Sequence, residues 1–157
     1  MIDITNESGV AVGEEGLVAL ARFTLAKLYV HPQAELSILL VDEETMAAYH
    51  QQFMDEEGPT DVLSFPMDEL TPGEEDRPSA PGVLGDVVLC PAVTARQAAE
   101  SHRTAAQEQD YLLVHGLLHL LGFDHDEPAS KQEMFELNDA IIAAWGTEDH
   151  RRWGAGR

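Results

Sequence analysis

The chain has 157 residues, which suits one domain with a substantial core and is too short for two. Asp and Glu total 29 against 9 Lys and Arg, and the formal charge of −20 argues against tight, nonspecific nucleic-acid binding, which depends on neutralising phosphates. The single Cys90 excludes an internal disulfide, and neither an export signal nor an apolar run of the ~20 residues that span a bilayer is visible. We therefore expect a cytoplasmic protein without a membrane or DNA partner.

The acidic surface has two interpretations. It serves solubility alone, or it faces a basic protein partner. It does not exclude a polyanionic substrate, because a divalent metal and a few local arginines can supply positive potential where chemistry happens.

The first half of the chain alternates between strand and helix patterns. Residues 2–5 alternate apolar and polar side chains, as a short strand does. Residues 16–30 place leucines at helical spacing, and residues 35–41 form an apolar run typical of a buried strand. Asp42 is a favourable N-cap for a helix from Glu43 to about Phe53, which begins with acidic residues where the helix dipole favours them.

The middle of the chain contains two strands separated by a proline-rich, acidic segment. Residues 62–65 form a short strand bounded by prolines, and residues 83–90 form a second one, expected to run antiparallel to the first. Residues 66–82 between them are predicted to be a loop. A loop of this length is either a functional lid or a disordered insertion.

The second half is helical. Three helices are predicted, over residues 92–101, 105–121 and 128–145. Gly146 is expected to end the last helix, and residues 147–157 are expected to be a frayed tail. The sequence thus predicts one α+β domain over residues 1–157, in which a small mixed β-sheet packs with helices.

Three histidines lie within the apolar run that closes the second of these helices. His115 and His119 share one helix face one turn apart, and a turn at Gly122 can bring His125 back towards them. Three imidazoles from a helix and the following turn leave one corner of a tetrahedron open, as catalytic zinc sites do. A bound zinc lowers the pKa of its water to about 7, so the predicted reaction class is hydrolysis.

Other interpretations of the histidines remain open. A single histidine on an apolar face is more often a core residue, but burying three imidazoles without a common partner costs about 1–3 kcal/mol each. The metal is purely structural if Asp124 or Asp126 supplies a fourth ligand. A zinc peptidase normally presents His-Glu-x-x-His, and here Gly116 occupies the place of the glutamate that acts as base.

Three segments together resemble one family. Residues 115–125 (HGLLHLLGFDH) resemble the signature of the YbeY family, the metal-dependent endoribonucleases of ribosomal RNA maturation. Residues 59–66 (PTDVLSFP) and residues 84–88 (LGDVV) resemble the family's second and third segments. The resemblance covers most of the chain and is weakest at residues 6–34 and after residue 146.

The resemblance implies a site and a role. His115, His119 and His125 carry over as ligands of one zinc per chain. The implied activity is cleavage of single-stranded RNA in 3′-end maturation of small-subunit ribosomal RNA and in ribosome quality control, on ribosomal particles. A basic small-subunit ribosomal protein is the implied partner, which gives the charge of −20 a use. The alternative is a ribosome assembly factor that zinc only stabilises.

One departure from the family concerns phosphate binding. Members often have an arginine five residues before the proline of Pro-Thr-Asp, and Met54 stands there in this chain. Arg96, Arg103 or an arginine of the tail are the candidates to replace it.

Supporting residues are expected on the two strands that border the site. Asp61, Ser64 and Asp86 are the candidates, since a carboxylate that fixes an imidazole tautomer is a common need of metal sites. Turn capping by Asp61 and strand-end hydrogen bonding by Asp86 are the structural alternatives. Asp124 either assists the metal-bound water or only shapes the turn.

Overall fold

The computed structural model describes residues 1–124 and 126–153, with side chains up to residue 146. Its centre is a four-stranded sheet in the order β1-β2-β4-β3. The strands are β1 (Ile2–Asn6), β2 (Glu35–Leu40), β3 (Val62–Pro66) and β4 (Val83–Leu89). β1, β2 and β4 are parallel, whereas β3 runs antiparallel to β4. The small mixed sheet and the antiparallel pairing are therefore confirmed.

In the part of the chain that the structure describes, five helices accompany the sheet. They are α1 (Glu14–Lys27), α2 (Glu43–Met54), α3 (Pro91–Glu100), α4 (Ala105–Leu120) and α5 (Pro128–Trp153). α1 ends earlier than expected, because Tyr29 takes a left-handed backbone with φ of 55°. The predicted end of the last helix at Gly146 is wrong, since a glycine inside a helix costs only about 1 kcal/mol and no proline follows. Residues 147–153 belong to this helix instead of a frayed tail, and residues 154–157 lie outside the described part.

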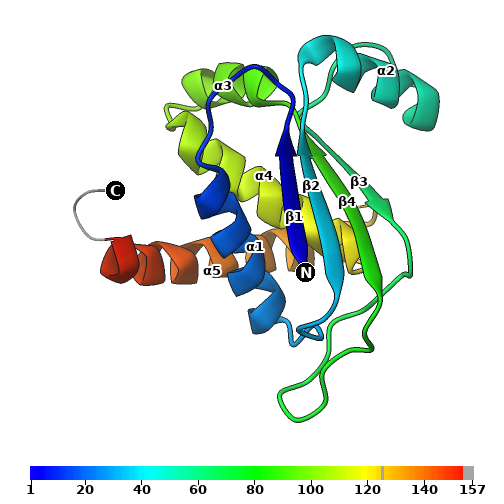
Figure 1. Cartoon of the computed structure of the whole chain (residues 1–157), viewed down its shortest axis with the longest axis vertical. Coiled ribbons are helices and arrows are strands. Elements are labelled where there is room, and N and C mark those ends of the chain that lie inside the picture. Colours follow the sequence, from blue (N-terminus) through cyan, green and yellow to red (C-terminus); the bar gives the residue numbers. More distant parts are fainter. Residues whose placement is uncertain (125, 154–157) are drawn as a thin grey trace.

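The larger core lies between one face of the sheet and helices α1, α4 and α5, which gather on that face (Figure 1). Leu36, Ile38 and Leu40 of β2 point into it, because alternate residues of a strand face the same side. α4 contributes the centre of this core, with Leu113, Leu117 and Leu118 fully buried. Each such leucine stabilises the fold by about 1.5–3 kcal/mol, so α4 is firmly held against the sheet.

The opposite face of the sheet is only partly covered. A smaller core joins Met46 of α2 to Leu63, Val88 and Cys90. α2 starts as predicted, with the Asp42 carboxylate accepting a 2.8 Å hydrogen bond from the backbone N–H of Thr45. It covers one end of the face, as Figure 1 shows. Towards the other end the side chains are exposed, among them Asp3, Glu35 and Ser37.

The segment between β3 and β4 projects past one end of the sheet in Figure 1. It is tied to the chain that follows α1: the N–H of Gly73 donates to the carbonyl of Leu28 at 2.9 Å, and that of Ser79 to Tyr29 at 2.9 Å. In this conformation it packs against the α1–β2 connection.

None of the helices within residues 1–124 and 126–153 has the length and apolar character that crossing a membrane requires.

Candidate active site

α4, which carries two of the three histidines, is fixed at both ends. At its start the Thr104 hydroxyl accepts from the N–H of Gln107 at 3.0 Å, and the Gln107 side chain accepts from the N–H of Thr104 at 2.9 Å. This reciprocal capping box satisfies two backbone donors. At its end Gly122 takes a left-handed φ of 96°, and its N–H donates to the carbonyl of His119 at 3.1 Å. The predicted stop at Gly122 is confirmed.

His115 and His119 lie side by side on one face of α4. Their ring centroids are 4.8 Å apart with the planes at 79°, and both side chains are half-buried. The His115 ring also stacks on Phe135 of α5, with centroids 6.0 Å apart. The shared face is thus as predicted. His125 lies outside the described residues, so the three-histidine set stays a prediction.

A cleft of about 460 Å³ opens beside the two imidazoles. His115 and His119 form one wall, and residues of β3 with Met54 form the other. A second hollow of about 300 Å³ adjoins it, and His115 and Asp61 line both. No residue of the 67–82 segment lines either space.

Two of the three supporting candidates reach this cleft. Ser64 lines it and donates a 2.9 Å hydrogen bond from its hydroxyl to the carbonyl of Gly116. Asp61 also lines it, while its Oδ1 accepts from the N–H of Val62 at 2.7 Å. Asp61 therefore caps the start of β3, and its carboxylate lies at the cleft wall.

Asp86 is not brought to the histidines. Leu84 faces the α4 side of the sheet, and strict alternation would put Asp86 there too. A β-bulge intervenes, however, since neighbouring residues of β2 pair with Val83 and Gly85 and leave Leu84 as the extra residue. The bulge shifts the alternation, so Val87 faces α4 and Asp86 faces the opposite side with Val88.

Gly116 lies where the backbone of α4 meets the sheet. A Cβ atom there would lie 2.8 Å from Cγ1 of Val87 and 3.2 Å from both the Ser64 hydroxyl and Cγ2 of Val62. No larger side chain fits without moving α4. The glutamate that acts as base in a zinc peptidase would therefore have no room at this position.

The contacts of Asp124 and the burial of Cys90 give each residue a structural role. The Asp124 carboxylate accepts a 3.4 Å hydrogen bond from the N–H of Asp126, which supports its turn-shaping role.

Burial raises the pKa of the Cys90 thiol, so this side chain stays protonated near neutral pH. It also belongs to the smaller core on the other face of the sheet. Cys90 is thus a packing residue.

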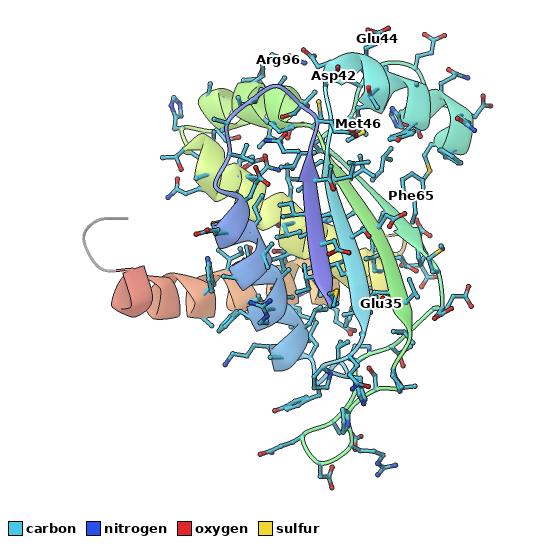
Figure 2. All side chains as sticks on the ribbon, in the orientation of Figure 1. Glu35, Asp42, Glu44, Met46, Phe65 and Arg96 are labelled. Atoms are coloured by element: carbon cyan, nitrogen blue, oxygen red, sulfur yellow. The ribbon has the colours of Figure 1, made fainter. Side chains whose placement is uncertain are left out.

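The sequence interpretation missed part of the site. Tyr111 and Phe135, which it did not name, line the second hollow with His115, and Arg103, one of its candidates for a phosphate contact, lines that hollow too. The spacing of Tyr111, four residues before His115, was a visible signal for a shared face. Arg96, by contrast, forms a 2.6 Å ion pair with Glu43. Figure 2 shows it beside Asp42, where α2 begins.

Comparison with known proteins gives the family. A family model described as Endoribonuclease YbeY matches residues 3–146. The chain belongs to the YbeY family. An Endoribonuclease YbeY of Cutibacterium acnes is 66% identical over 152 residues, covering 96% of each chain. One of Thermobifida fusca is 58% identical over 144 residues, covering 92% of this chain and 93% of the relative.

A solved structure shares the fold. The solution structure of a Thermotoga maritima protein aligns with a TM-score of 0.63 at 29% identity, covering 96% of this chain and 93% of that one. The resemblance carried by residues 59–66, 84–88 and 115–125 is thereby confirmed, since all three YbeY segments lie within the matched range.

The side chains described at the cleft are of types that bind zinc. Two neighbouring imidazoles face a cleft with the Asp61 carboxylate among its lining residues, and zinc takes nitrogen and oxygen ligands of these types. Among the side chains that the structure describes, no three of His, Cys, Asp or Glu come close enough to hold an ion together. His125, the third predicted ligand, is not among them.

Proposed function

We propose that this chain is a zinc-dependent endoribonuclease that cleaves single-stranded RNA beside His115 and His119. His125 completes the ligand set for one zinc per chain. The observation that carries the proposal is the pair of imidazoles, one turn apart, on the wall of an open cleft in a member of an endoribonuclease family. A zinc bound there would supply an activated water and stabilise charge on a phosphoryl oxygen.

The surrounding residues act by positioning. The Ser64 hydroxyl ties β3 to the carbonyl of Gly116, the residue next to His115. Phe135 packs against the His115 ring from the α5 side. The stacking on Phe135 restricts the direction of the His115 ring, and the Ser64 bond holds the backbone beside it. Asp61, which lines the cleft, would orient a group bound there.

We also propose the biological setting. The substrate is the 3′ end of small-subunit ribosomal RNA, in maturation and ribosome quality control within the cytoplasm. The net charge of −20 suits docking on a basic small-subunit ribosomal protein, while the cleft meets the RNA. Docking by surface charges weakens as salt rises, because the Debye length falls from about 10 Å at 0.1 M to 3 Å at 1 M. Salt-insensitive binding to ribosomal particles argues against this partner.

The competing functions make different predictions. A zinc peptidase needs a base where Gly116 is packed against Val87, and that position has no room for one. A non-catalytic assembly factor stabilised by zinc would bind the metal and leave RNA intact. Cleavage itself therefore separates the two remaining candidates.

The test compares single-stranded with duplex RNA. The wild type is expected to cleave the single strand preferentially. The variants His115→Ala, His119→Ala and His125→Ala should each lower the cleavage rate by more than about 100-fold, the upper end of what losing a residue that only supports a metal ligand costs. His31→Ala is the matched control, because this histidine accepts from the N–H of Gln33 and lines neither hollow. Cleavage that survives chelation and all three substitutions would refute the proposal.

A further inference from the structure

An acidic nuclease needs a local cation for its substrate. Met54 lines the cleft at the position where the resemblance leads one to expect an arginine. Of the arginines whose side chains are described, Arg22, Arg77 and Arg96 line neither hollow beside the histidines of α4. Arg103 lines one of them.

Arg103 is held in a defined orientation. Its Nη1 donates to Oε1 of Glu108 at 3.0 Å, and its guanidinium carbon lies 5.3 Å from the centroid of the Tyr111 ring. The Arg103 side chain is nevertheless 47% exposed, whereas that of Glu108 is 12% exposed. A guanidinium has five N–H donors, so donors remain after the bond to Glu108. Being fixed in advance lowers the entropy that binding a phosphate costs.

Arg103 contacts the helix face that carries the histidines. Tyr111, His115 and His119 are spaced four residues apart, so they form one stripe along α4. Arg103 packs on Tyr111 and lines the hollow that His115 also lines, but it does not line the cleft that both histidines line. This arrangement suits a phosphate next to the one held at the histidines.

The other wall of the same hollow is aromatic. Phe135 is partly exposed and stacks on His115, and the Lys131 ammonium lies 5.9 Å from the Phe135 centroid. Partly exposed aromatic rings with adjacent cations are the features on which the bases and backbone of single-stranded nucleic acids bind. Phe135 therefore adds a stacking surface to the hollow that Arg103 lines.

We propose that the hollow lined by Arg103, Tyr111 and Phe135 is an RNA subsite in which Arg103 binds the phosphate next to the cleaved one. The subsite rests on the proposed ribonuclease function and extends it. Arg103, which lies in the α3–α4 connection, supplies the cation that Met54 does not.

The test measures how the affinity for a short single-stranded RNA depends on salt. Arg103→Gln with Glu108→Gln removes both charges, leaves the net charge unchanged and keeps a side-chain hydrogen bond possible. Losing one phosphate contact should lower the slope of log K against log salt by about 0.7 and weaken binding by about tenfold. Arg96→Gln with Glu43→Gln is the matched control on a remote ion pair and should leave both quantities at wild-type values.

A second variant avoids any change to buried Glu108. Ser101 is exposed and lines the same hollow, so Ser101→Glu should weaken RNA binding, whereas Thr71→Glu in the remote loop should not. Wild-type slope and affinity in both the Arg103 double variant and Ser101→Glu would overturn the subsite. If the wild type still cleaves RNA and His119→Ala does not, the proposed function stands without it.

Discussion

The Ser64 hydroxyl and the carbonyl oxygen of Gly116 are joined by a 2.9 Å hydrogen bond. This contact links the edge strand β3 to the middle of α4, immediately beside His115. Since the backbone of α4 already makes its own helical hydrogen bonds, the Ser64 bond positions the helix as well as stabilising the fold. The substitutions below test that link and the other contacts that hold α4 and the sheet.

Ser64→Ala should lower the free energy of unfolding by about 1 kcal/mol, the usual net value of one hydrogen bond. It should also reduce RNA cleavage, because the segment next to His115 loses its tie to β3. Urea unfolding and cleavage rates measure the two effects. Ser37→Ala, on the exposed face of β2, is the control and should change neither. Equal behaviour of both variants would contradict the role given to Ser64.

Gly116→Ala should destabilise the protein by about 1–3 kcal/mol, because the added methyl group meets the rigid Val87 side chain at 2.8 Å. Gly146→Ala is the matched control in α5, where an added Cβ meets nothing within 4 Å. That variant should gain up to about 1 kcal/mol from helix propensity. Opposite shifts of the urea midpoint are expected, and a gain at both positions would show that α4 has room to move.

Thr104→Ala should cost about 1 kcal/mol of stability, because one half of the capping box at the start of α4 is lost. Thr104→Ser retains the hydroxyl and should recover most of that loss. Denaturant unfolding with an unchanged m-value measures it. A Thr104→Ala variant as stable as the wild type would mean that packing alone fixes the start of α4.

The cap of α2 should make a pH-dependent contribution. The backbone N–H of Thr45 lowers the pKa of Asp42, so the stabilisation is present above the unfolded-state value of about 3.9 and is lost as pH falls through the lower folded-state value. Asp42→Asn still caps but does not titrate. The stability advantage of the wild type over Asp42→Asn should therefore shrink between pH 5 and the acid limit. An advantage that grows towards acid pH would reverse the assignment.

The sequence predicted the elements and the histidine face well, because both depend on local periodicity. The shared face of His115 and His119 needs only helix geometry, and the stop at Gly122 needs only a residue that tolerates a left-handed backbone. The predicted end of α5 at Gly146 was wrong for the same local reason, since one glycine is a weak stop when no proline follows.

The rest of the site depends on packing between distant segments. Asp86 lies on the far face because a bulge at Leu84 shifts the alternation of β4, and a period-two pattern does not show where an extra residue falls. Arg103 joins His115 only through the way the α3–α4 connection folds back on Tyr111. No spacing in the sequence encodes that contact.

The proposed hydrolysis of RNA at this cleft needs one metal ion per chain. The direct measurement is the rate of single-stranded RNA cleavage by chelator-treated protein as zinc is added back. The rate should be near zero without metal, rise with added zinc and level off at about one equivalent, with no recovery for His119→Ala. A chelated protein that cleaves at the full rate, or a rate that ignores added zinc, would contradict the account.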